Sequence, residues 1–241
     1  MKLAVVACLH GNAMGLEAVL ADAKARQATQ VVAVGDLLGG HPDHAEVIRI
    51  LRDANLATVT GVLDEAALGD LADAKAMGDN PFSRAFLWAA EHLSEEDRRW
   101  IHALPKTHGI EGGGSPHLVV CHNSPRKLDE KMDWTTTFTD RAYGEIFEQT
   151  GAGVIARANL HGQFSVARGG RMVVNVGTGG VPVDGDARAG YALFEAVPGG
   201  WRVDLLRIPY DTERAAQRIL DSGMPDGEAR ARLTRTGIRT W

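Results

Sequence analysis

The chain has 241 residues and a mass of 25.8 kDa, enough to bury one substantial core, and we expect a single domain over residues 1–241. Hydrophobic residues make up 44% and charged residues 24% of the sequence, which is the composition of a soluble globular protein and excludes a disordered or fibrous chain. The net charge of −5, without any basic block, argues against duplex nucleic acid as a partner. The first apolar run is too short for a signal peptide or a membrane span. With only two cysteines, we expect a cytoplasmic protein without a disulfide framework.

The start of the sequence alternates short apolar runs with amphipathic segments. Lys2–Val6 and Val31–Val34 predict buried strands, and apolar residues at helical spacing follow each of them, between Leu16 and Ala23 and again over Glu46–Arg52. A third strand is expected at Ala57–Thr60. Two strand–helix units in tandem predict an α/β fold whose sheet begins with parallel strands.

The composition then changes to Ala, Leu and charged residues, which predicts helix from Asp64 to about Leu104, with Ser94 as an N-cap. The second half has shorter apolar runs, and its Gly169-Gly170 and Gly199-Gly200 pairs suit hairpins. An amphipathic helical region is expected after Asp211. The expected strands of this half are Leu118–Cys121, Val154-Ile155, Arg171–Val176, Gly190–Glu195 and Trp201–Ile208.

Side chains that can bind a metal follow four separate apolar runs. Because the carboxyl ends of strands in an open α/β sheet line one crevice, we expect these groups to converge there. Imidazole and carboxylate groups suit Zn, Mn or Fe, and a Cys8 thiolate would favour the more thiophilic metals. A hydrogen-bonded loop residue is the alternative at any single position, and the coincidence at four strand ends favours a metal site. The candidates are Cys8 and His10, Asp36, His122, and His161 with Gln163.

The other histidines give no ligand pattern. His41 and His44 flank Pro42-Asp43 in a predicted loop beside Asp36. They either support the candidate ligands from behind or face solvent, and we expect the latter. A surface position is also expected for His92, His102, His108 and His117.

Two further features leave alternatives open. The Gly177-Thr178-Gly179-Gly180 segment either presents backbone amides to a phosphate or forms a plain tight turn. Cys8 and Cys121 are a candidate redox pair, but strand alternation places Cys121 and His122 on opposite faces and favours Cys121 as a small buried hydrophobic residue.

The spacing of the motifs resembles that of the calcineurin-like metallophosphoesterases, in their compact bacterial and archaeal phosphodiesterase-type branch. The resemblance runs nearly end to end and implies a four-layer αββα sandwich with a two-metal site at the strand ends. Homo-oligomers are common in this branch, so the resemblance also leaves a homo-oligomer open. The motifs that carry the resemblance are Cys8-Leu9-His10-Gly11-Asn12, Gly35-Asp36, Gly61-Val62-Leu63-Asp64, His122-Asn123-Ser124-Pro125, Leu160-His161-Gly162-Gln163 and Asn175-Val176-Gly177-Thr178.

The resemblance also implies a ligand set with several departures from the family pattern. Its positions for one metal are Cys8, His10, Asp36 and Gln163, and those for the other are Asp36, Val62, His122 and His161. Val62 offers no oxygen ligand, and Gln163 offers only a neutral carbonyl oxygen. Leu63 occupies the position of the family's catalytic histidine, which acts beside the substrate phosphate. These departures predict a remodelled site that holds one or two divalent transition-metal ions, with Mn, Fe or Zn as candidates.

We therefore predict a metal-dependent phosphoesterase that hydrolyses a phosphomonoester or phosphodiester weakly or narrowly. Its partner would be a small phosphorylated molecule or nucleotide rather than a membrane. The alternative is a catalytically inactive pseudo-phosphoesterase that acts as a ligand-binding or regulatory module. The sequence assigns no phosphate-binding residue, and we expect substrate choice to lie in Leu68–His92 and Arg126–Thr139.

Overall fold

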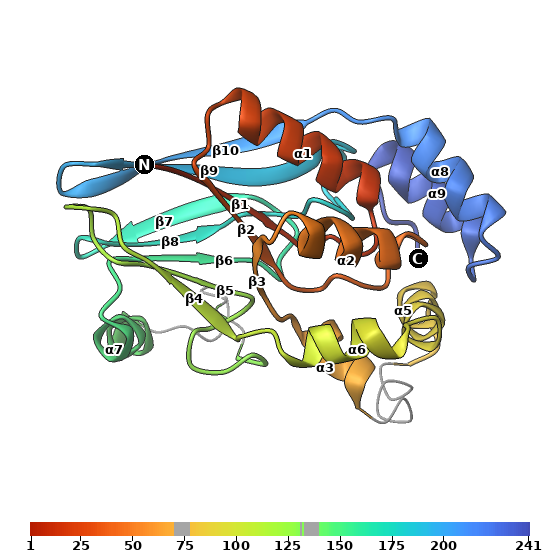
Figure 1. Cartoon of the computed structure of the whole chain (residues 1–241), viewed down its shortest axis with the longest axis horizontal. Coiled ribbons are helices and arrows are strands. Elements are labelled where there is room, and N and C mark those ends of the chain that lie inside the picture. Colours follow the sequence, from red (N-terminus) through yellow and green to blue (C-terminus); the bar gives the residue numbers. More distant parts are fainter. Residues whose placement is uncertain (70–77, 131, 133–139) are drawn as a thin grey trace.

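Two β-sheets lie face to face in this computed structural model, which describes residues 1–69, 78–130, 132 and 140–241 (Figure 1). In the described parts of the chain each sheet has five strands. The first sheet has the order β10-β9-β1-β2-β3, with β1 parallel to β2, β2 parallel to β3, and β9 antiparallel to both β1 and β10. Its strands are β1 (Lys2–Ala7), β2 (Gln30–Val34), β3 (Ala57–Val59), β9 (Ala189–Val197) and β10 (Gly200–Ile208).

The second sheet has the order β4-β5-β6-β8-β7. Its three central strands are parallel, and an antiparallel strand pairs at each edge. Its strands are β4 (Thr107–Ile110), β5 (Leu118–Cys121), β6 (Val154–Arg157), β7 (Phe164–Arg168) and β8 (Arg171–Asn175).

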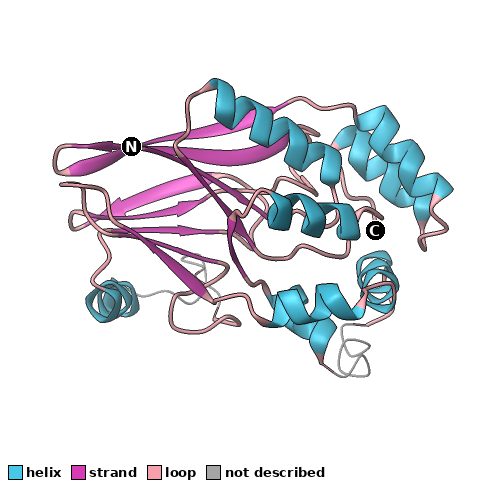
Figure 2. Ribbon diagram, in the orientation of Figure 1, coloured by secondary structure: helices cyan, strands magenta, loops and turns pink. Residues whose placement is uncertain are grey.

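Helices cover the outer faces of the two sheets (Figure 2). Helices α1, α2, α3, α5 and α6 contribute side chains to the cluster on the first sheet, while α7 packs on the second. Helices α8 and α9 lie side by side at the end of the molecule toward which β1 runs (Figure 1). The helices are α1 (Ala13–Ala25), α2 (His44–Asp53), α3 (Val62–Leu68), α5 (Pro81–Glu91), α6 (Glu95–His102), α7 (Asp140–Thr150), α8 (Thr212–Asp221) and α9 (Gly227–Thr236).

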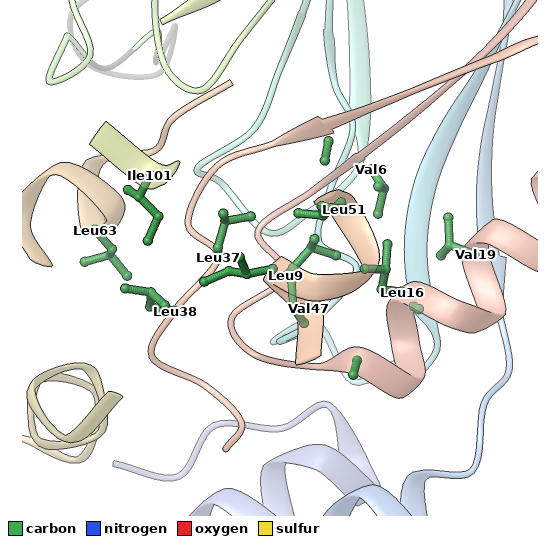
Figure 3. Close-up of a cluster of buried hydrophobic side chains, with 14 of the residues drawn as sticks. Val6, Leu9, Leu16, Val19, Leu37, Leu38, Val47, Leu51, Leu63 and Ile101 are labelled. Carbon is green, nitrogen blue, oxygen red and sulfur yellow. The ribbon is translucent and has the colours of Figure 1, made fainter. Parts of the chain in front are cut away.

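Strand β1 is buried on both faces, which explains its continuous apolar sequence. Leu3 and Val5 point into the cluster between the two sheets, and Ala4 and Val6 point into the cluster beneath the helices. Figure 3 shows part of the helix-side cluster, where Val6 lies near Leu16 and Val19. The resulting order of helices, sheet, sheet and helix is the predicted four-layer αββα sandwich, and the α/β fold class is confirmed.

The sequence prediction missed two edge strands. Strand β4 includes His108 and Gly109, and strand β7 alternates half-buried with exposed residues, so neither has the apolar run of a central strand. The hairpins predicted at Gly169-Gly170 and Gly199-Gly200 are confirmed. The segment predicted as helix from Asp64 contains α3, α5 and α6, but residues 70–77 lie outside the described part.

Candidate metal centre

The chain turns sharply after β1 and after β2, and both turns use non-glycine residues in the left-handed region. Cys8 has a φ of 50°, His10 a φ of 47° and Asp36 a φ of 55°. Such residues are strained and persist only where surrounding contacts fix them. Here the backbone N–H of His10 donates to the carbonyl of Asp36 at 2.9 Å, which ties the two turns together at the carboxyl edge of the sheet.

A buried carboxylate fixes the turn that carries Asp36. Asp64 accepts the backbone N–H groups of Asp36, Leu37 and Gly61, each at 2.8 Å. Gly61 must be glycine because a Cβ there would lie 2.1 Å from the backbone nitrogen of Asp36. The ends of β2 and β3 therefore approach each other closely, and the Asp36 side chain is set by both.

His10 and His161 face each other across the site. Their Nε2 atoms are 3.1 Å apart, while Nδ1 of His10 bonds to the carbonyl of Leu38 at 2.8 Å and Nδ1 of His161 bonds to that of Val181. A carbonyl only accepts, so each Nδ1 carries the proton and each neutral ring presents a lone pair at Nε2. Burial lowers the pKa of His10. Burial, and then the repulsion that a protonated His10 would exert, lowers the pKa of His161 to about 3, so both rings are neutral near pH 7.

Two lone pairs at this distance repel unless a cation lies between them. Two imidazole nitrogens on one tetrahedral zinc ion lie about 3.3 Å apart, given Zn–N bonds of roughly 2.0–2.1 Å. The spacing and tautomers of His10 and His161 therefore fit a shared metal ion.

Asp36 and His122 form a second pair. Oδ2 of Asp36 lies 3.2 Å from Nε2 of His122, and Oδ1 accepts the backbone N–H of Leu63 at 2.9 Å. Neither ring nitrogen of the fully buried His122 has an aligned hydrogen-bond partner among the described residues, which leaves a ring nitrogen available to a metal ion. Although burial opposes both charges, the Asp36 carboxylate raises the pKa of His122, and His122 holds the pKa of Asp36 well below its usual range.

The thiol of Cys8 joins the two pairs. Its Sγ lies within 4.8 Å of ligand atoms of His10 and His161, and also within 4.8 Å of ligand atoms of Asp36 and His122. Burial and then the charge of Asp36 raise the pKa of Cys8 well above its ordinary value, so the thiol loses its proton only beside a cation. Sulfur, imidazole and carboxylate donors together fit a divalent transition metal.

A cavity of about 410 Å³ opens beside these ligands. His10, Asp36 and His161 line it, together with residues from α5 and from the segment after residue 226. The second group includes Arg230, Arg239 and Trp241, which the sequence analysis did not single out because they belong to no motif.

The sequence of residues 1–198 matches the family model described as the calcineurin-like phosphoesterase superfamily domain. The chain belongs to this superfamily. Membership supports a phosphoesterase-type function and the use of divalent metals, and the ligand groups of this structure agree with both.

Similar proteins cover nearly the whole chain. An uncharacterized protein of Methanocaldococcus jannaschii is 25% identical over 239 residues, covering 93% of this chain and 94% of the relative. The crystal structure of a metallophosphoesterase from Sphaerobacter thermophilus has a TM-score of 0.77 at 25% identity and covers 99% of both chains. A hypothetical protein of Pyrococcus horikoshii shares the fold with a TM-score of 0.81 at 19% identity, again over 99% of both chains.

The candidate ligands group differently from what the resemblance implies. His161 lies with His10 rather than with His122, and Cys8 belongs to both groups. Gln163 makes other contacts: its Nε2 donates to the carbonyls of Val176, Tyr191 and Leu206 at 3.0–3.1 Å, and its Oε1 accepts from Arg207 at 2.8 Å. These bonds favour a structural role for Gln163, and its role as a ligand stays a prediction.

Leu63 does not face the cavity. Its side chain packs with Leu37, Leu38 and Ile101 in the helix-side cluster (Figure 3). Only its backbone N–H takes part in the site, through Asp36. The position at which the resemblance implied a catalytic histidine thus holds a core residue here.

The prediction that His41 and His44 face solvent is wrong. They are only 3% and 4% exposed, because α9 covers the loop at His41 and Trp88 packs against the ring of His44. Burial and the charge of Arg230 lower the pKa of His41 to about 3. Helix α9 is almost 200 positions away in sequence, so no local pattern indicates this contact. His92 and His102 are exposed, whereas His108 and His117 are half-buried.

The structure also distinguishes the alternatives for the Gly177-Thr178-Gly179-Gly180 segment and for the two cysteines. Thr178 Oγ1 donates to the carbonyl of Cys8 at 2.8 Å and accepts the N–H groups of Gly180 and Val181, while the N–H of Gly179 donates to Ala7. These amides hold the segment against β1, so it is a tight turn rather than a phosphate loop. Cys121 is buried beneath α7 and Cys8 lies between the sheets, both as free thiols.

Proposed function

We propose that the protein is a metal-dependent phosphoesterase that hydrolyses a narrow range of phosphomonoesters or phosphodiesters, and slowly. The observation that carries the proposal is the pair of facing Nε2 atoms of His10 and His161, 3.1 Å apart, with both Nδ1 atoms bonded to carbonyls. Inside the superfamily, such a pair beside an open cavity supports metal-assisted hydrolysis.

The residues divide into two ligand groups. Cys8, His10 and His161 would hold one ion, and Asp36 and His122, with Cys8 as a shared neighbour, would hold a second. Bound there, a divalent ion supplies an activated water molecule and neutralises charge on the phosphoryl oxygens. The sulfur donor favours zinc or iron over manganese.

The reaction breaks an ester P–O bond, forms a P–O bond to water, and gives the leaving oxygen a proton. An acid that donates this proton contributes about 10²- to 10⁴-fold to the rate. The Leu63 side chain has no proton to donate and lies in the core. We therefore expect useful rates only with leaving groups that depart without help, such as nitrophenolates.

The partner we propose is a small phosphorylated molecule or nucleotide. The cavity of about 410 Å³ is the size of sites that take such ligands. Duplex nucleic acid is not proposed, because the net charge is −5. Among the described residues, no helix is long and apolar enough to cross a membrane.

A binding module without turnover is the second candidate. It is favoured by Val62 and Leu63, because neither side chain supplies a ligand atom or a proton. In that case the site would hold a metal and a phosphorylated ligand and release the ligand unchanged.

The test combines metal content with hydrolysis. Protein purified without chelator would be assayed by elemental mass spectrometry and with bis(4-nitrophenyl) phosphate, alongside His10→Ala, His161→Ala and the exposed control His102→Ala. We expect one or two metal ions and slow hydrolysis, with the metal content reduced and hydrolysis lost in the first two variants, and both kept in the control. Metal without turnover would favour the binding module. Fast hydrolysis of an unactivated alkyl phosphomonoester would contradict the narrow range proposed here.

A further inference from the structure

The cavity beside the candidate metal centre has two unlike walls. One wall carries the ligands His10, Asp36 and His161. The other carries arginines and apolar side chains from elements far apart in the sequence, which are Phe82, Leu160, Val183, Arg230, Arg239 and Trp241. A ligand that fills the cavity must therefore meet both walls.

Arg230, on α9, is a buried cation that forms no ion pair with a carboxylate among the described residues. It is 3% exposed, its Nη1 donates to the carbonyls of Gly39 and Gly40, and its Nη2 donates to that of Pro81. Within the described part of the chain its Nε has no hydrogen-bond partner, and Asp226 is paired with Arg84 instead. Burial lowers the pKa of Arg230 to about 10, so the side chain still carries its charge near pH 7. A buried guanidinium balanced only by carbonyls suits an anionic ligand.

Arg239 adds a second positive charge on the same wall. It lines the cavity and is exposed, and it forms no ion pair in the parts of the chain that the structure describes. With Arg230, this wall can bind the oxygens of a phosphate whose phosphorus lies toward the histidine pair.

The rest of the wall is aromatic and aliphatic. The ring of Phe82 lies edge-on to that of His10, with centroids 6.1 Å apart, and so brings an aromatic surface next to the ligands. Leu160 and Val183 are 37% and 38% exposed, which is unusual for large apolar side chains in this fold. Apolar surface left open at the mouth of a polar site marks the place where an apolar part of a ligand binds.

On the basis of the function proposed above, we propose that the substrate is a phosphate ester whose alcohol part carries an aromatic group, in the class of nucleotides. Because its leaving group is a sugar alkoxide and Leu63 supplies no proton, such a substrate would be hydrolysed slowly. Its phosphate lies between the histidine pair and Arg230, and its ring lies against Phe82 and Trp241. Phe82 and Trp241 therefore select the aromatic group, while Arg230 and the strand-end residues hold the phosphate.

The experiment compares two ligands that differ only in the base. Adenosine 5′-monophosphate and ribose 5-phosphate are titrated calorimetrically into the full chain, as purified and with added Zn²⁺, and each ligand is recovered to check that it is intact. We expect the nucleotide to bind at least about tenfold more tightly, as base stacking on an aromatic side chain does in other proteins.

Substitutions test which residues bind the base of the nucleotide and which bind its phosphate. Trp241→Ala should weaken nucleotide binding about tenfold and leave ribose 5-phosphate within about twofold, whereas Ile238→Ala, which removes an exposed side chain off the cavity, should change neither. Arg230→Gln should weaken both ligands equally, about tenfold. Because Arg230 is buried, Arg239→Ala provides a second variant without risk to the core, with a smaller equal loss, and Arg232→Ala on the exposed side of α9 is its control.

Equal binding of the two ligands by the wild-type protein, or unchanged nucleotide binding in Trp241→Ala, would overturn the assignment of an aromatic group. These outcomes are separate from failure of the proposed function. Hydrolysis without preference for the base would support the proposed phosphoesterase function and contradict the inference that the cavity selects an aromatic group. Selective binding of an intact nucleotide would keep the inference and remove turnover.

Discussion

The buried carboxylate of Asp64 accepts the backbone N–H of Asp36 at 2.8 Å, although 28 positions separate the two residues in the sequence. The same carboxylate also accepts the N–H groups of Leu37 and Gly61. Asp64 is therefore a positioning residue. It is not among the residues that line the cavity, and it fixes the position of Asp36.

Asp64→Asn should loosen this turn. The amide keeps one oxygen but presents an NH₂ group to a backbone N–H, so at least one hydrogen bond is lost. We expect the free energy of unfolding, measured by urea denaturation, to be about 1–3 kcal/mol lower than in the wild type. Zinc affinity, measured by chelator competition, should fall about tenfold. Asp53→Asn, at an exposed ion pair, is the control and should change neither value appreciably. Full zinc affinity in Asp64→Asn would mean that Asp36 needs no such support.

Cys8 should govern proton release on metal binding. Its raised pKa keeps the thiol protonated without a metal, whereas His10 and His161 are already neutral near pH 7. Cys8→Ser should therefore release one proton fewer per zinc ion than the wild type, measured with an indicator dye in weak buffer, and bind zinc at least about tenfold less tightly. Cys121→Ala, in the cluster beneath α7, should behave like the wild type. Equal proton release in Cys8→Ser would exclude the thiolate as a ligand.

Leu63→His should fail to restore an acid. The side chain at this position packs against Leu38 and Ile101, so an imidazole there is buried without a partner. We expect a loss of about 2 kcal/mol in the free energy of unfolding and less than a tenfold change in the rate with bis(4-nitrophenyl) phosphate. Val62→Asn, which places a polar side chain at the neighbouring half-buried position, is the variant with which Leu63→His is compared. A gain near 10²-fold in Leu63→His would show that the side chain reaches the substrate.

The stability of chelator-treated protein should fall as the pH falls, in part through His41. Burial lowers its pKa to about 3 in the folded protein, against about 6.5 in the unfolded chain, so between these values the unfolded state binds more protons. Stability from this group is complete above pH 6.5 and is lost as the pH drops below it. From pH 7.5 to pH 5.0 the loss is about 2 kcal/mol for one such histidine. His41→Gln should lose correspondingly less over the same range, as measured by urea denaturation at each pH. Parallel losses in the two proteins would mean that His41 titrates normally.

The strand ends could be located from the sequence because parallel buried strands have a strong local signature. Val31–Val34 is such a run, and the residue types after it, as after β1, identify the ligand-bearing turns. Cys8, His10, Asp36, His122 and His161 do come together, as their placement at strand ends predicted.

What the sequence could not provide is the direction in which each side chain points. Leu63 turns into the core and Gln163 turns toward three carbonyls, and both orientations depend on distant residues. The burial of His41 likewise depends on α9, and Arg230 reaches the cavity only because α9 packs at that end of the sheet. Local periodicity contains no information on such long-range contacts.

The cavity is lined by residues from two stretches of the chain, and the family model matches only the first of them. The candidate metal ligands all lie within residues 1–198, where the family model matches, whereas Arg230, Arg239 and Trp241 lie beyond it. A chimaera that keeps the first stretch and takes the second from a relative would keep the candidate metal ligands and Phe82 while exchanging Arg230, Arg239 and Trp241. The boundary near residue 198, which falls at the turn between β9 and β10, is thus a natural crossover point for recombining reactivity with selectivity.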